Sequence, residues 1–218
     1  MKKLSFETTP TYDFTLQNGR VDVWQFSLKD EPEWAFPLLD QAEQTRANRY
    51  HFPRHRRRFT VARALLRMIL ARYMNCDPKK IELLTHQHGK PYINTVTDLK
   101  FNLSHSKDSA LLGIGVHDEL GIDLEHFSER PFVGIANHVF SPQEVLAVVN
   151  ANAQQQTLTF FNIWAQKEAF IKAVGMGLAY PLQQFDVATV PQTECEVSDL
   201  FTQKTWRLLS FMATPSCC

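Results

Sequence analysis

Two acidic side chains alternate with apolar ones in the stretch GIDLEHF, residues 121–127. If this stretch is a β-strand, alternate side chains share a face, so Asp123 and Glu125 point the same way and lie about 7 Å apart. Two carboxylates at that separation could share one hard divalent cation. The alternative is a solvated strand face, which is the more frequent reason for a D-x-E pattern.

A third carboxylate, Glu168, lies at the edge of an apolar stripe in the predicted helix around WAQKEAFIK. Six residues form that stripe at 100° per residue, namely Phe160, Ile163, Trp164, Phe170, Ile171 and Val174. Lys172 follows Glu168 by four residues, so a surface ion pair is the simpler interpretation. That interpretation leaves Lys167 unexplained, because it falls inside the stripe, where a lysine is unexpected.

A helix edge with one acid and two lysines, facing a strand with two acids, would form a cation site. The lysines would then be available to phosphate oxygens. Oxygen ligands without a His/Cys cluster favour Mg²⁺ over Zn²⁺ at such a site.

Two other stretches could bind phosphate. FNLSHS supplies the hydroxyl of Ser104 and the imidazole of His105 after a short apolar strand, although an ordinary polar turn is the more frequent explanation of such a stretch. HGKPY places Lys90 in a turn that the following proline stiffens.

Nine arginines lie within residues 46–72. Three of them, Arg56, Arg63 and Arg67, are predicted to lie off the apolar stripe of their helix. A solvated helix face is the common reason for such a cluster, but its density also suits a multiply charged anion.

The overall composition sets few limits on function. The chain has 218 residues, 44% hydrophobic and 21% charged, with a formal net charge of zero, so charge predicts neither a nucleic acid nor a membrane partner. No apolar run approaches the roughly 18 residues of a membrane span, and the N-terminal MKKLSFETTP lacks the apolar core of a secretion signal. Four cysteines without a CxxC pair favour a reduced, cytoplasmic protein.

Periodicity and turn residues predict the elements that position these side chains. In the first half they are a strand at 20–28, a helix at 37–48, a helix from Pro53 to the NCDP stretch, and a strand pair at 80–93 turning at His88-Gly89. In the second half they are strands at 109–116 and 120–127, a helix at 141–149, a helix ending at Gly175, and strands at 184–190 and 205–213. Ser141, Pro142 and Glu144 form the expected start of the 141–149 helix.

Strands, two helices and further strands therefore occur twice along the chain. This order predicts an α+β fold made of two similar halves, with no residue-level repeat. We place the N-terminal half at residues 1–106 and the C-terminal half at 107–218.

Five motifs occur in the order GKPY, FNLSHS, GIDLE, FSPQE and WAQKEAFIKAVGMGL. Together they resemble the 4′-phosphopantetheinyl transferases of the larger, single-chain (Sfp-type) group. The resemblance covers about residues 46–186, and W-x-x-K-E-x-x-x-K followed by G-x-G-L is its most specific part. The ending FMATPSCC departs from the family pattern.

The resemblance implies two similar α+β halves with coenzyme A in the cleft between them. It implies transfer of the 4′-phosphopantetheine group from coenzyme A to a serine of an acyl or peptidyl carrier protein of polyketide, non-ribosomal peptide or fatty-acid synthesis. The reaction would need Mg²⁺ and release adenosine 3′,5′-bisphosphate.

Residue roles follow from the motif positions. Asp123, Glu125 and Glu168 match the family's Mg²⁺ ligands on the coenzyme A pyrophosphate, and Lys172 matches a lysine that contacts the same pyrophosphate. Glu168 would also take the serine proton, directly or through a water molecule, while Lys172 would stabilise the charge of the leaving group.

The same comparison implies roles at the nucleotide end of coenzyme A. Ser104 and His105 match a phosphate-binding turn, while Lys90 and Arg58 match cationic positions near the 3′-phosphate. Glu144 matches a family acid whose role stays open.

The expected partners are coenzyme A and an apo carrier protein, with no nucleic acid or membrane partner, and the resemblance implies a monomer. Two alternatives remain open: a Mg²⁺-dependent phosphohydrolase, and a non-catalytic nucleic-acid binder using residues 46–72. The second lacks the aromatic interleaving of a stacking platform.

Overall fold

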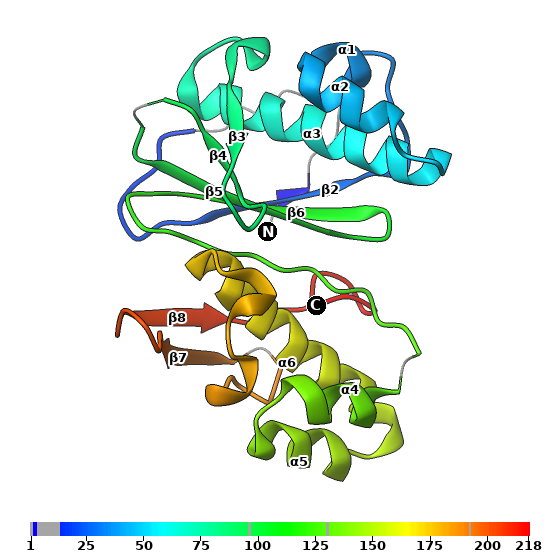
Figure 1. Cartoon of the computed structure of the whole chain (residues 1–218), viewed down its shortest axis with the longest axis vertical. Helices are drawn as coiled ribbons and strands as arrows, with labels where there is room; N and C mark the ends of the chain where they lie inside the picture. Colours follow the sequence, from blue (N-terminus) through cyan, green and yellow to red (C-terminus); the bar gives the residue numbers. More distant parts are fainter. Residues whose placement is uncertain (1, 4–13, 96, 130, 192) are drawn as a thin grey trace. The chain divides into compact units, whose positions relative to one another are not determined.

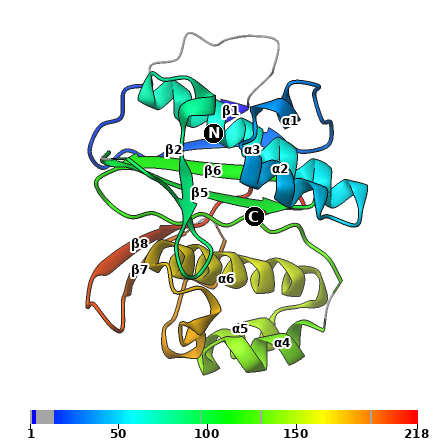
Figure 2. The same ribbon diagram turned by 45° about the horizontal axis from the view of Figure 1, so that its top comes forward.

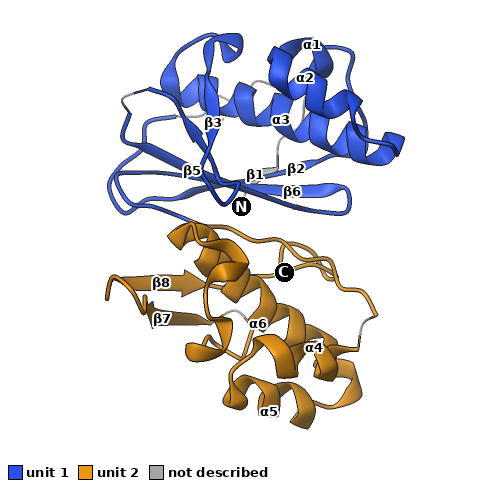
Figure 3. Cartoon of the chain, in the orientation of Figure 1, with its two compact units in different colours: residues 1–120 blue, residues 121–218 orange. Residues whose placement is uncertain are grey.

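A computed structural model describes residues 2–3, 14–95, 97–129, 131–191 and 193–218. Most of residues 1–10, the stretch in which the sequence analysis found no secretion signal, lies outside the described residues. The chain divides into two compact units, Met1–Leu120 and Gly121–Cys218, shown in blue and orange in Figure 3. Each unit combines helices with strands, which confirms the predicted α+β class.

The sheet of the first unit has the strand order β1-β2-β6-β5. Its strands are β1 (Lys2–Lys3), β2 (Asp22–Ser27), β5 (Leu99–Ser106) and β6 (Ser109–Val116). A two-residue turn at Lys107 and Asp108 joins β5 to its antiparallel partner β6. The predicted division after residue 106 would separate these paired strands, and the compact unit instead continues to Leu120.

Three helices, α1 (Ala35–Leu38), α2 (Gln41–Asn48) and α3 (Pro53–Met74), lie on one face of this sheet (Figures 1 and 2). The single helix predicted at 37–48 is two helices. Asp40 interrupts it, because its extended backbone and its capping box with Glu43 start a new helix. The long helix α3 ends at Asn75, whose left-handed backbone (φ 48°) forms the C-cap.

The core of the first unit lies between the sheet and α3. Trp24 and Phe26 of β2 and Leu112 of β6 pack against Leu65 and Leu66 of α3. All five side chains are buried, so the period-3.6 stripe predicted for α3 does cover the sheet.

A separate hairpin carries Lys90. It consists of β3 (Leu83–Thr85) and β4 (Pro91–Ile93), paired antiparallel and preceded by the 3₁₀ turn η1 (Pro78–Lys80). The turn at Gly89 needs a positive φ (87°), and the N–H of His86 donates to the carbonyl of Lys90 at 2.9 Å. The predicted strand pair and its turn are confirmed.

The second unit is built around helix α6 (Ala153–Val174), with α4 and α5 beside it in Figure 1. Its other elements are α4 (Phe132–Val139), α5 (Pro142–Asn150), η2 (Gly177–Ala179), η3 (Leu182–Gln184), β7 (Glu194–Ser198) and β8 (Thr205–Leu209). The capping box of α5 is confirmed, whereas α4 was not predicted. Helix α6 starts at Asn152, earlier than predicted, and ends at Gly175 in the left-handed region (φ 84°), as predicted.

The strand predicted at 184–190 is wrong. Phe185 and Val187 are buried as expected of a strand, but side chains rather than a neighbouring strand satisfy the backbone around them. The N–H of Val187 donates to Glu144 at 2.9 Å, and the carbonyl of Ala188 accepts from Gln166 at 2.7 Å. The strand that pairs with β8 lies later, at β7.

No helix in the described part of the chain is both long and apolar enough to cross a membrane.

Candidate active site

The segment that carries Asp123 and Glu125 approaches helix α6 closely at Gly121. A β-carbon added to Gly121 would lie 2.0 Å from the carbonyl oxygen of Ala169 and 2.5 Å from the backbone nitrogen of Ala173. Only glycine permits this approach, which brings the acidic segment beside the turn of α6 that carries Glu168 and Lys172.

The same segment pairs with the C-terminal residues. The N–H of Glu125 donates to the carbonyl of Cys218 at 2.6 Å, and the N–H of Cys218 returns a bond to Glu125 at 3.1 Å. The N–H of Phe127 donates to the carbonyl of Ser216 at 3.0 Å. These bonds hold Glu125 by its backbone. They could not be predicted from the sequence, because the C-terminal residues match no motif.

The strand predicted at 120–127 is therefore not formed as such. The segment is extended, and among the described residues it forms an isolated bridge between His126 and Cys217. The predicted alternation nevertheless appears in the burial of the residues, since Ile122 and Leu124 are buried while Asp123 and Glu125 are half-buried.

The three predicted carboxylates lie within electrostatic reach of one another in the second unit. Burial raises the pKa of Glu168, and the charges of Asp123 and Glu125 raise it further, against the opposing effect of Lys172. The ammonium of Lys172 forms a short ion pair with Asp123, whose side chain is only 5% exposed. The indole N–H of Trp164 donates to Glu125 at 3.0 Å.

The donor set suits a hard divalent cation by its chemistry. Among the residues that the structure describes, three carboxylates, Asp123, Glu125 and Glu168, lie near the ammonium of Lys172. All the donor atoms are carboxylate oxygens, the ligands that Mg²⁺ prefers. Within the described ranges, however, no three His, Cys, Asp or Glu side chains are arranged so that they could hold a metal ion. Lys172 and Trp164 contact two of the acids instead.

Lys167 does not serve the role expected of it. Its side chain is 1% exposed and forms a 2.9 Å ion pair with Glu144. Its ammonium also donates to the carbonyl oxygens of Leu182 and Phe185, both at 2.7 Å. The expectation that Lys167 would be available to phosphate is wrong, because burial and three acceptors hold it inside the unit.

Glu144, whose role the motif comparison left open, is a structural residue here. Its carboxylate accepts the N–H of Ser141 and the N–H of Val187, each at 2.9 Å, besides pairing with Lys167. It thus joins the start of α5, the middle of α6 and the loop after η3.

Lys90 and Arg58 lie in the first unit and form ion pairs there. The ammonium of Lys90 lies 2.8 Å from Glu119 and also donates to the carbonyl of Leu120 at 3.2 Å. Arg58 contacts Asp108 at 2.9 Å. The hydrogen bond from Arg58 lowers the pKa of Asp108, although the small degree of burial opposes this.

Ser104 and His105 belong to strand β5 and not to a turn. They pair with Leu111 and Ala110 of β6, and Ser104 is buried while His105 is exposed. Adjacent residues of a strand point to opposite faces of the sheet, so the expected phosphate-binding turn is not formed. The turn of this hairpin comes later, at Lys107-Asp108.

The arginine cluster is largely engaged within the first unit. Arg67, predicted to lie off the apolar stripe, is fully buried, contacting Glu43 at 2.7 Å and Asp40 at 2.5 Å. The Arg67 guanidinium also donates to the carbonyl of Ile81 at 2.6 Å. The prediction for Arg67 was wrong because a helical projection of α3 does not include the two acids at the start of α2, which are what allow this arginine to be buried.

Comparisons with known proteins identify the family of the chain. Residues 119–214 match the 4′-phosphopantetheinyl transferase superfamily, and residues 23–114 match the N-terminal domain of a 4′-phosphopantetheinyl transferase. The chain is 34% identical over 215 residues to the 4′-phosphopantetheinyl transferase HetI of Nostoc sp., covering 94% of this chain and 88% of the relative. It is 29% identical over 166 residues to the 4′-phosphopantetheinyl transferase Sfp of Bacillus subtilis, covering 73% and 70% respectively.

The fold and these matches define the class of the protein as a group-transferring enzyme, a transferase. The chain belongs to the 4′-phosphopantetheinyl transferase family. The predicted family and the predicted enzyme class are confirmed.

Proposed function

We propose that this protein transfers the 4′-phosphopantetheine group from coenzyme A to a serine of an acyl or peptidyl carrier protein and releases adenosine 3′,5′-bisphosphate. The observation that carries the proposal is the set of three acids and one lysine in the second unit. Asp123 is paired with Lys172, and the pKa of Glu168 is raised by burial and by two neighbouring carboxylates.

The residues proposed to hold a divalent cation, Mg²⁺ by preference, are Asp123, Glu125 and Glu168. When bound there, the cation would neutralise the pyrophosphate of coenzyme A, which otherwise repels an incoming oxygen nucleophile. Lys172 lies at the same site and would contribute a further positive charge. With a cation held by Asp123, the Lys172 ammonium would be available to a pyrophosphate oxygen.

The serine Oγ of the carrier protein attacks the phosphorus that bears the pantetheine. A new P–O bond forms as the bond to the second phosphate breaks, and adenosine 3′,5′-bisphosphate leaves with its electron pair. Glu168 accepts the serine proton, and its raised pKa suits this role because a stronger base takes a proton more readily. Lys172 stabilises the negative charge on the departing group.

The first unit is proposed to bind the nucleotide end of coenzyme A. Lys90 and Arg58 are the cations assigned to the 3′-phosphate region, and each already pairs with an acid of the unit. Ser104 and His105 stay candidates for single phosphate contacts, from opposite faces of β5.

The test is to incubate the protein with coenzyme A, Mg²⁺ and an apo carrier protein and then to weigh the carrier by mass spectrometry. Transfer adds about 340 Da, the mass of the phosphopantetheine group. The variant Asp123→Asn should reduce the rate at least a hundredfold while circular dichroism and melting stay as in the wild type. Glu196→Gln removes an exposed acid of β7 and serves as the matched control, with an unchanged rate.

The outcomes separate the competing functions. A phosphohydrolase would consume coenzyme A without adding mass to the carrier, and a nucleic-acid binder would leave both unchanged. Wild-type turnover by Asp123→Asn in the presence of Mg²⁺ would remove the acids from the mechanism.

A further inference from the structure

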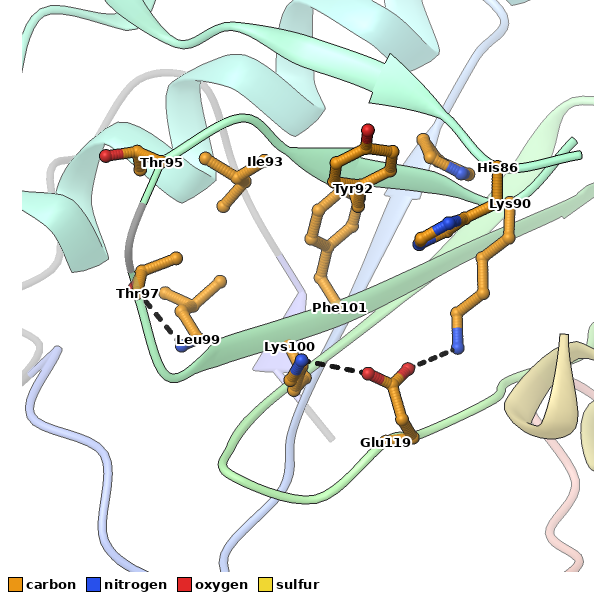
Figure 4. A pocket seen from close by; sticks show the side chains of 11 residues that line it. His86, Lys90, Tyr92, Ile93, Thr95, Thr97, Leu99, Lys100, Phe101 and Glu119 are labelled. Carbon is orange, nitrogen blue, oxygen red and sulfur yellow. Dashed lines mark hydrogen bonds and ion pairs between the residues drawn. The ribbon is translucent and has the colours of Figure 1, made fainter.

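A carboxylate bridges two lysines at the edge of a cavity in the first unit. The Oε2 atom of Glu119 lies 2.8 Å from the ammonium of Lys90, and its Oε1 atom lies 2.9 Å from that of Lys100 (Figure 4). Each oxygen thus serves one cation, which is how two oxygens of a phosphate monoester would engage the same pair.

The cavity beside this bridge has a volume of about 220 Å³ and is lined by all three charged side chains. Figure 4 shows Tyr92 and Phe101 among its other walls. It therefore joins an apolar, aromatic surface to two cations, which suits a ligand that combines a ring system with a phosphate.

Lys90 and Glu119, two members of this bridge, differ in how firmly the fold holds their side chains. Lys90 is nearly buried and has a second acceptor, the carbonyl of Leu120 at 3.2 Å, so it keeps its direction without Glu119. Glu119 is 46% exposed and can turn toward solvent. Partial burial opposes ionisation of Glu119, but Lys90 and Lys100 outweigh this and lower its pKa, so the carboxylate stays charged at neutral pH.

We propose that, without ligand, the carboxylate of Glu119 occupies the position between Lys90 and Lys100 that the 3′-phosphate of coenzyme A takes on binding. The phosphate would then displace this carboxylate. The inference rests on the proposed function and adds two residues to it: Lys100 as a second phosphate-binding cation, and Glu119 as a competitor that weakens binding of coenzyme A and leaves the affinity for ligands without that phosphate unchanged. A ligand lacking the phosphate has nothing to displace Glu119 and gains nothing from the two lysines.

The experiment measures the dissociation constants of coenzyme A and dephospho-coenzyme A by titration calorimetry in Mg²⁺, for the wild type and Glu119→Gln. Neutralising Glu119 removes the competing charge, so we expect binding of coenzyme A to tighten about threefold to tenfold. Dephospho-coenzyme A should change less than twofold. The matched control is Asp98→Asn, which removes the same charge from an exposed acid that contacts His117, and it should leave both constants unchanged.

A second arm uses Lys100→Gln. In the wild type its charge is partly cancelled by Glu119, so the loss of coenzyme A affinity should be larger when Lys100→Gln is made in the Glu119→Gln background. Equal losses in the two backgrounds would overturn the proposal.

Weaker or unchanged coenzyme A binding by Glu119→Gln would show that Glu119 only positions the lysines. An equal gain for coenzyme A and dephospho-coenzyme A would show that the 3′-phosphate is not the group that displaces Glu119. Either result leaves the proposed function standing if the carrier protein still gains mass. Failure of the wild type to bind coenzyme A at all would instead overturn the proposed donor, and this inference with it.

Discussion

At the scale of single residues, the candidate site brings like-charged carboxylates together in a partly buried region, which is unfavourable for the folded chain. Glu168 shares a partly buried region with Asp123 and Glu125, and Lys172 opposes their charge. Such an arrangement lowers stability when the site has no cation bound, because like charges repel and the acids lose hydration. Residues kept at this cost are characteristic of functional sites.

The variant Glu168→Gln should therefore raise stability while it removes activity. For an acid whose pKa is raised on folding, the stabilising contribution is full below the ordinary value of 4.5 and is lost as pH rises through the raised pKa. In EDTA at neutral pH, we expect the variant to melt a few degrees above the wild type. The transfer rate should fall at least a hundredfold.

The difference in melting temperature should disappear below about pH 4.5, where glutamate is protonated in both states. Glu196→Gln, at an exposed position of β7, provides the comparison and should show no such pH dependence. A Glu168→Gln protein that is less stable than the wild type at every pH would contradict the strain assigned to this residue.

At the scale of elements, contacts to α6 position the chemistry. On one side Gly121 brings the acidic segment against Ala169 and Ala173. On another side Lys167 is anchored to Glu144 and to the carbonyls of Leu182 in η3 and of Phe185 just after it. Because Lys167 and Glu168 are neighbours on one helix, the buried lysine fixes the rotation that directs the acid toward the site.

Gly121→Ala tests the close approach. Its β-carbon would meet the Ala169 carbonyl at 2.0 Å, so the acidic segment must move away from α6. We expect a loss of about 1–3 kcal/mol in the free energy of unfolding, measured with urea, together with a reduced transfer rate.

Gly134→Ala is the matched control, because nothing lies within 4 Å of its added β-carbon on helix α4. It should stabilise the protein by about 0.5–1 kcal/mol, since alanine favours a helix over glycine. Equal stabilities of Gly121→Ala and the wild type would contradict the packing described for this segment.

At the scale of the whole molecule, the formal charge is zero although residues 46–72 are rich in arginine. The structure accounts for much of that excess inside the first unit. Arg57 and Arg58 pair with Asp108, while Arg67 is buried against Asp40 and Glu43. Others lie over aromatic rings, as Arg46 does over Phe59, Arg54 over Phe52 and Arg56 over Phe36. These three arginines are exposed and keep their charge. The carboxylates of Asp40, Glu43 and Asp108 offset part of the cluster, and the rings that could stack on bases are already covered by guanidinium groups.

We accordingly expect no measurable binding to a fluorescein-labelled DNA duplex in an anisotropy titration at 150 mM salt. A protein that neutralises several phosphates shows an affinity that falls steeply with salt. Micromolar binding with such a slope would revive the nucleic-acid alternative, and repeating the titration with coenzyme A present would show whether both ligands use the same arginines.

The sequence predicted the parts of the molecule that depend on local periodicity. Helix α3, helix α6 with its Gly175 cap, the β3–β4 hairpin and the alternation around Asp123 all follow from spacing and turn residues. It failed at 184–190, where Glu144, Gln166 and Lys167 bond to the backbone of the segment. It also failed at the C-terminal tail, whose backbone pairs with Glu125 and Phe127. Periodicity describes burial but carries no information about which partner satisfies a buried N–H or carbonyl.

The hydrogen bond from Trp164 to Glu125 gives the protein an optical property of its own. An indole in contact with a carboxylate of the cluster can pass its excitation to a luminescent lanthanide bound there. Terbium emission excited through tryptophan would then report on occupancy in the unlabelled chain, and Trp164→Phe would extinguish that signal while the three other tryptophans stayed in place.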